Sequence, residues 1–299
     1  MICIKKERGR GGLPWPPMVA AEHRIQTLRR IAWVCLVLLL AVTSLSAFLR
    51  HQALPIDGTS LVAAARLAHR ITATSALLLV IAMLVLSLRI TPPPRAERAL
   101  SMGLLALALA LALLGVFTTG ARAPAVAMGN LLGGYCMLAL AARLLLSAGT
   151  RGLGGLAVAA AALLLLQITS GVLLSATHAG RACSDLAECR ALVHGIGWDW
   201  QALNPWGEPL VAGLPPQAEG APAQLLHRLG SVVVAPMLAW LGVAAIRHGR
   251  RHEGIALLAL LAVQVALGMG VGSTGLPLLP VLLHNLAAAL LLALVLRLA

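Results

Sequence analysis

Eight apolar stretches, each long enough to cross a lipid bilayer, dominate this sequence of 299 residues. A helix needs roughly 20 apolar residues to span a hydrocarbon core of about 30 Å. The stretches are continuous runs of Leu and Ala without the alternation of a membrane β-barrel. With 60% hydrophobic and 11% charged residues, the chain has more apolar surface than one soluble core needs. The sequence therefore predicts an all-α polytopic membrane protein with eight transmembrane helices, at roughly 31–49, 67–88, 100–119, 125–146, 153–175, 225–246, 255–273 and 278–297.

The sequence also repeats itself, and the two copies carry histidines at matching places. LAHRITATSALLL aligns with LLHRLGSVVVAP, so the pairs His69-Arg70 and His227-Arg228 each open an apolar run. Further along, GNLLGGYCMLAL aligns with HNLAAALLLAL, which begins at His284. A repeat of this length predicts two related helical bundles. We expect two pseudo-symmetric four-helix bundles, with the N-terminal one over residues 31–149 and the C-terminal one over residues 150–299.

The distribution of basic residues predicts the orientation in the membrane. If the N-terminus is cytoplasmic, the inner segments hold 16 of the 23 Lys and Arg residues, and the outer segments hold most of the acids. The positive-inside rule then places both termini in the cytoplasm. The net charge of +13 is explained by this topology, so a nucleic-acid partner is not expected, and the partner surface is membrane lipid. Residues 1–30 are expected to be a basic cytoplasmic tail and not a cleavable signal.

The longest loop, residues 176–224, is predicted to lie on the outer side. Its three tryptophans suit a small cap or amphipathic segment at the membrane interface, and a role in gating substrate is the alternative. Cys183 and Cys189 stand six residues apart in this loop, where an oxidising compartment favours a disulfide. The alternatives are two free thiols or a metal pair, and the metal pair is disfavoured because no nearby Cys or His completes a usual zinc spacing.

Three histidines enter the membrane at similar depth beneath the outer surface: His69, His227 and His284. A buried imidazole needs a partner, and a hydrogen bond to a neighbouring helix would be one solution. Axial ligation of haem iron accounts better for three histidines at one depth, and the following Arg70 and Arg228 could pair with propionate carboxylates. His227 and His284 belong to the same bundle and are predicted to ligate one haem from facing helices.

The N-terminal half lacks the second histidine. The alignment puts Gly129 opposite His284, so His69 has no partner, and one side of any haem in this half would be open to substrate or oxygen. Gly129, Gly133 and Gly134 either leave room for a flat macrocycle or serve close helix packing.

Together these features resemble the haem A synthase family, over nearly all of residues 31–299. The matching motifs are His69-Arg70, the NLLGG run, the loop SATHAGRACSDLAEC, LLHR at His227 and HNL at His284. The resemblance implies a bacterial inner-membrane oxidoreductase of cytochrome oxidase assembly that converts the C8 methyl group of haem O to the formyl group of haem A. It also implies haem b in the C-terminal half as the electron-transfer cofactor. Because the two halves are asymmetric, we expect the lone His69 of the substrate half to be the catalytic residue. The implied partners are haem O, an unidentified electron donor, and haem O synthase or oxidase assembly proteins.

The sequence departs from the family pattern in the N-terminal half. Arg66 stands where the family has a glutamate, a histidine is absent from the fourth helix, and the first outer loop lacks a cysteine pair. Two other function classes therefore stay open: a b-type cytochrome that passes electrons from quinol to a partner, and an assembly factor that binds haem without oxidising it. All three classes need the same His227 and His284 site.

Overall fold

The computed structural model describes residues 15–51, 60–91, 94–118, 123–145, 153–207, 218–273 and 275–299. These residues form helices and connecting turns without a strand, and eight helices are long and apolar enough to cross a membrane. The predicted fold class is confirmed. The eight helices are α1 (Trp15–His51), α2 (Ser60–Leu88), α3 (Arg95–Phe117), α4 (Pro124–Leu144), α5 (Gly154–Thr177), α7 (Ala221–Arg247), α8 (Arg251–Ser273) and α9 (Leu278–Leu298).

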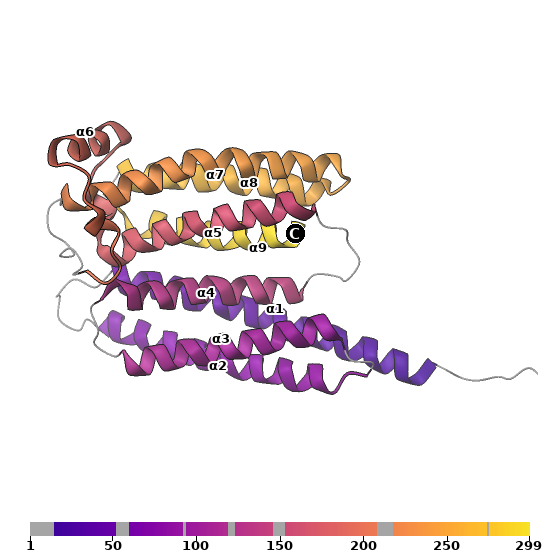
Figure 1. The fold of residues 1–299 in the computed structure, drawn as a ribbon. Coiled ribbons are helices and arrows are strands. Elements are labelled where there is room, and N and C mark those ends of the chain that lie inside the picture. Colours follow the sequence, from indigo (N-terminus) through magenta and orange to yellow (C-terminus); the bar gives the residue numbers. More distant parts are fainter. Residues whose placement is uncertain are drawn as a thin grey trace, which may run out of the picture.

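The eight helices form two bundles that lie side by side (Figure 1). In the first bundle, α1 packs against α2 and α4, and α3 packs against α2 and α4. In the second bundle, α5, α7, α8 and α9 pack in the same cyclic order. The bundles meet where α4 contacts α5 and α9 and where α1 contacts α9. The Tyr135 hydroxyl of α4 donates a hydrogen bond across this seam to the Asn285 carbonyl at 3.2 Å.

Helix α1 begins 16 residues before the predicted start of the membrane helix at residue 31, so residues 15–30 of the predicted basic tail are helical. Pro16 and Pro17 fall in the first turn, where a missing N–H leaves no intrahelical bond unmade. No further proline or glycine follows before the membrane-spanning part, so nothing stops the helix. Arg24 donates to the carbonyl of Arg89 at the end of α2, at 2.5 Å, and this bond ties the extension to the bundle.

A cap covers one end of the second bundle and reaches α4 of the first, and we call this end of the molecule the α6 end (Figure 1). The cap comprises η1 (Ala179–Arg181), α6 (Leu186–Ile196), η2 (Trp200–Leu203) and η3 (Ala218–Gly220). It packs mainly on α7, and it also reaches the first bundle, because the Ala125 amide of α4 donates to the Pro205 carbonyl at 2.7 Å. The start of α1 and the end of α9 lie at the opposite end. The start of α1 and the end of α9 are therefore on one side of the described structure, and the cytoplasmic location of that side stays a prediction.

The tryptophans of the cap are accessible. Trp200 and Trp206 are 71% and 76% exposed, and Trp198 meets Trp200 edge to face with ring centroids 5.3 Å apart. Exposed indoles at a helix-bundle end suit the predicted place at the membrane interface.

Candidate functional site

The three intramembrane histidines lie near the α6 end of their helices. His69 is nine residues after the start of α2, and His227 and His284 are each six residues after the starts of α7 and α9. At 1.5 Å per residue, these positions are about 9 to 14 Å below the helix starts. The histidines are thus at similar depth, as the sequence predicts. His227 and His284 share the second bundle and are close enough for a direct electrostatic interaction, whereas His69 stands in the first bundle.

Helix α5 holds the imidazole of His227 by one edge. The Nδ1 atom lies 2.8 Å from Ser170 Oγ and 3.2 Å from Gln167 Nε2, and the same amide nitrogen donates to the His227 carbonyl at 2.9 Å. A Cβ atom on Gly171 would stand 2.9 Å from His227 Cε1, so the ring occupies the space that this glycine leaves. Because these bonds all use Nδ1 or the backbone, Nε2 is the nitrogen that can bind a ligand.

Helix α8 contacts His284 in a similar way. The Nε2 atom of His284 lies 3.2 Å from Gln264 Nε2, and a Cβ atom on Gly268 would stand 3.1 Å from His284 Cε1. In the described part of the chain, His284 Nδ1 and Gln264 Oε1 are both buried without a hydrogen-bond partner. Leaving a buried polar atom unpaired costs about 1 to 3 kcal/mol. The protein alone therefore leaves this imidazole incompletely satisfied.

A Gln-x-x-x-Gly motif accounts for both arrangements. Gln167 and Gly171 are four residues apart on α5, and Gln264 and Gly268 have the same spacing on α8, which puts each pair on one helix face. In each case the glutamine binds a histidine of the adjacent helix and the glycine makes room for its ring. Sequence reasoning missed these four residues. The available signal was a glutamine within an apolar run, where polar side chains are costly. The signal occurs twice, and each time a glycine follows four residues later.

The first bundle has a different arrangement around His69. Its Nε2 atom lies 2.9 Å from Ser46 Oγ of α1, the side chain is half-buried, and the neighbouring Arg66 and Arg70 are exposed. The sequence of α3 and α4 contains no histidine, so the partner position at Gly129 provides no imidazole.

The glycines of α4 serve close packing. A Cβ atom on Gly129 would stand 3.0 Å from Leu114 Cδ2, one on Gly134 would stand 3.1 Å from Thr43 Cγ2, and one on Gly133 would overlap Leu111. Side chains of α1 and α3 therefore fill the space beside α4. Of the two interpretations of these glycines, the structure favours helix packing over room for a macrocycle.

A polar cluster that sequence reasoning missed lies at the seam between the bundles. Arg50, at the end of α1, interacts electrostatically with Tyr135 of α4 and with His178, which caps α5. Its Nη1 atom is buried and has no hydrogen-bond partner among the described residues. His178 has a left-handed backbone with φ 58°, which is uncommon for a non-glycine residue. Burial of the ring, and then the charge of Arg50, hold the pKa of His178 below its usual range.

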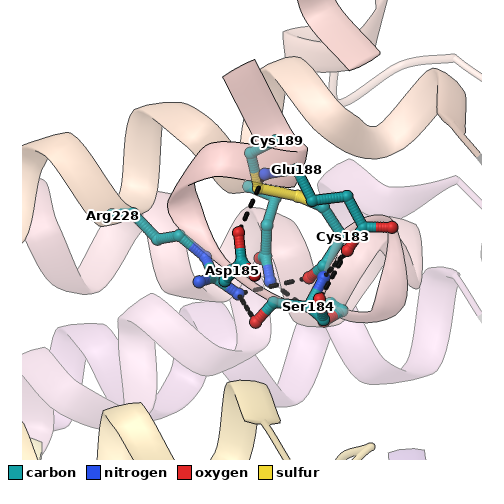
Figure 2. Close-up of a disulfide and its surroundings, with 8 residues drawn as sticks. Cys183, Ser184, Asp185, Glu188, Cys189 and Arg228 are labelled. Atoms are coloured by element: carbon teal, nitrogen blue, oxygen red, sulfur yellow. Dashed lines mark hydrogen bonds between the residues drawn. A yellow bond between two sulfur atoms is a disulfide. The ribbon is translucent and has the colours of Figure 1, made fainter. Parts of the chain in front are cut away.

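Cys183 and Cys189 form the predicted disulfide, with their Cα atoms 5.2 Å apart (Figure 2). The Asp185 carboxylate accepts from the Glu188 amide at 2.8 Å and so caps α6. The Glu188 carboxylate accepts from both the hydroxyl and the amide of Ser184, and these bonds lower the pKa of Glu188. The bridge and the cap together define a compact turn.

Arg228 connects this turn to the histidine site. Its Nη2 atom donates to the carbonyls of Cys183 at 3.2 Å and Ser184 at 2.9 Å (Figure 2). Because Arg228 follows His227 directly, the disulfide turn is anchored to α7 one residue from the imidazole. The suggested pairing of Arg228 with a propionate stays a prediction, as does that of Arg70.

A family model described as cytochrome oxidase assembly protein, COX15-CtaA, matches residues 52–296. The matched range includes the three histidines, the disulfide and both Gln-x-x-x-Gly motifs. No curated protein matches the chain.

Proposed function

Because the chain belongs to the COX15-CtaA family of cytochrome oxidase assembly proteins, we propose that it is a haem A synthase, a membrane oxidoreductase that oxidises the C8 methyl group of haem O. The family match bears out the resemblance that the sequence motifs indicate. The observation that carries the proposal is the pair His227 and His284, which project into one bundle from α7 and α9 and are each held by a Gln-x-x-x-Gly motif.

The donor set around this pair fits a b-type haem. Imidazole is a common ligand of haem iron, so His227 and His284 would hold the group from α7 and α9. Among the described residues, no three His, Cys, Asp or Glu side chains gather into a metal site built from protein alone. The unpaired Nδ1 of His284 and Oε1 of Gln264 also fit a site that a further group completes. When bound there, haem b would supply one-electron transfer.

The residues of this chain would orient that haem. Gln167 and Ser170 fix the Nδ1 edge of His227, which leaves Nε2 as the ligand atom. At His284, Gln264 lies beside Nε2, so the buried and unpaired Nδ1 is the nitrogen that remains for a ligand. The disulfide turn, tied to α7 by Arg228, would keep water away from the α6 side of the site.

The first bundle is the proposed substrate half. Oxidation of a methyl group to a formyl group takes up one oxygen atom and releases four electrons, so dioxygen or another oxidant is consumed. His69 would hold haem O at one face, because α3 and α4 contain no histidine and Gly129 stands at the position that matches His284. The unpaired Nη1 of Arg50, at the same end of the bundle, could donate a hydrogen bond to a propionate carboxylate.

One specific observation favours a second candidate function. Arg66 replaces an acidic residue expected before His69, and the glycines of α4 are packed against side chains of α1 and α3. A haem-handling assembly factor would need the second bundle and could dispense with an oxidising site in the first.

The discriminating experiment uses a bacterial strain that makes haem O and has no other haem A synthase. The chain and its His69→Ala variant are expressed there, and extracted haems are separated by reversed-phase chromatography and identified by mass. Haem A with the wild-type chain and none with the variant is the expected result. If the wild-type chain is folded in the membrane and yields no haem A, the assembly-factor function is favoured and the synthase proposal is wrong.

A further inference from the structure

A shallow groove of about 370 Å³ lies between α8 and α9 at the end opposite the cap. It is lined by His252, Glu253, Ala256, Leu294 and Arg297. The first three residues share one face in the first turns of α8, and the last two are on the last turns of α9. No residue of the proposed haem sites takes part in it, because the three histidines discussed above lie near the other end of their helices.

The groove carries an excess of positive charge. The Glu253 carboxylate is 3.6 Å from Arg250 Nη2 and 3.5 Å from Arg297 Nε, so one acid is shared by two arginines. Arg251 and His252 are exposed beside it. The Nη1 atom of Arg250 is buried and lacks a hydrogen-bond partner within the described residues. The arginines at this rim, Arg250, Arg251 and Arg297, outnumber its one acid, Glu253, so the rim is attractive for an anion.

The groove is also preformed. Arg250 Nη2 donates to the Arg297 carbonyl at 3.0 Å, and the Leu153 amide at the start of α5 donates to the Leu298 carbonyl at 2.7 Å. The end of α9 is thus fixed to both α8 and α5. The small side chain of Ala256 leaves the hollow open, and Leu294 gives it an apolar wall. The positive end of the α8 dipole lies at Arg251 and adds to the attraction for an anion.

The location determines what kind of anion fits. Arg251 and Leu298 are the ends of two membrane-spanning helices, so the charged rim lies at headgroup level and the apolar wall lies toward the hydrocarbon. We propose that this groove binds an anionic phospholipid, with the headgroup phosphate beside Arg297 at the rim and an acyl chain along Ala256 and Leu294.

Native mass spectrometry of the purified full chain in detergent tests this, with titration by phosphatidylglycerol and, separately, by phosphatidylcholine. Phosphatidylglycerol should bind more tightly. Arg297→Gln should weaken its binding about fivefold, because one basic residue near a charged headgroup contributes about 1 kcal/mol. Arg143→Gln is the matched control, since Arg143 is an exposed arginine on the last turn of α4 at the same end of the molecule and outside the groove. It should leave the affinity unchanged.

Two further variants separate the proposal from a general loss of structure. Ala256→Leu keeps every charge and fills the groove, so it should weaken phosphatidylglycerol binding. Glu253→Gln removes a carboxylate whose negative charge repels the lipid phosphate, and it breaks both ion pairs. It should therefore strengthen lipid binding even though it removes native contacts. A variant that had simply lost its fold would change affinity in the same direction as Arg297→Gln.

Several results would overturn the proposal. Equal affinity for the two lipids would show that the groove does not distinguish an anionic headgroup from a zwitterionic one. Equal losses in Arg297→Gln and Arg143→Gln would show diffuse surface attraction. A third arm adds inorganic phosphate to the lipid titration: no competition is expected at equimolar phosphate, and displacement of the lipid there would identify a free-phosphate site instead.

Discussion

Gly171 is the position where a small change should most specifically disturb the proposed haem site. In Gly171→Ala the new Cβ would stand 2.9 Å from His227 Cε1, whereas ordinary contacts begin at 3.4 Å, so the ring or the helix has to move by about 0.5 Å. An unligated ring can rotate away, but a ring bound to iron is fixed, so the strain falls on the haem-bound state. Overpacking of this kind costs about 1 to 3 kcal/mol, which corresponds to roughly 5-fold to 150-fold weaker haem binding.

The assay is absorbance titration of the haem-free purified protein with haem b. Gly155→Ala is the control on the same helix, because its Cβ would have no neighbour within 4 Å. Gly268→Ala should have a smaller effect than Gly171→Ala, because the corresponding distance to His284 is 3.1 Å. The reasoning is refuted if Gly171→Ala binds haem as tightly as the wild type and the Gly155→Ala control.

Three further predictions concern the cap and the first bundle. Cys183→Ser should lower the free energy of unfolding by about 2 kcal/mol, as expected for a loop this short; alkylation of the wild-type chain without reductant, followed by mass analysis, should leave both loop cysteines unmodified, and two modified loop thiols would contradict the bridge. The folded pKa of His178 is lowered, so its neutral ring favours the folded state above the unfolded pKa of about 6.5, and this stability is lost as the pH falls below that value. Melting temperatures at pH 7.5 and 5.5 should therefore differ more for the wild type than for His178→Asn, which tolerates the same backbone, and equal differences would count against this role. His69→Ala should leave the absorption spectrum of the second-bundle haem nearly intact while abolishing haem A formation, and loss of both would show that the two bundles are not independent.

The number and positions of the membrane helices could be predicted from the sequence, because the thickness of the bilayer sets the length of the apolar run that spans it. The α6 end of each membrane helix was predicted to within a few residues, apart from the start of α2, which the structure extends from residue 67 to Ser60. The start of α1 was missed because the charges of Arg24, Arg29 and Arg30 indicate the end of the apolar run, and a helix can continue beyond the hydrocarbon. Prolines at its first turn were the available signal.

The site was predictable in part. Histidines at one depth and cysteines six apart are visible in a single sequence, and the structure places them accordingly. The hydrogen-bond partners of the histidines could not be predicted, because the sequence does not show which helix packs against Gln167 or Gln264. The structure shows that Gln167 contacts His227 and Gln264 contacts His284. The same holds for Arg228, whose carbonyl partners lie on a turn that the disulfide defines.

The proposed function depends most directly on the pairing of His227 and His284 at one haem iron. Electron paramagnetic resonance of the purified oxidised protein, loaded with haem b, measures this pairing, because two imidazole ligands give a low-spin ferric signal. The wild type should show that signal, and His227→Ala and His284→Ala should each replace it with a high-spin signal at unchanged protein fold. A low-spin signal that persists in both variants would contradict the account.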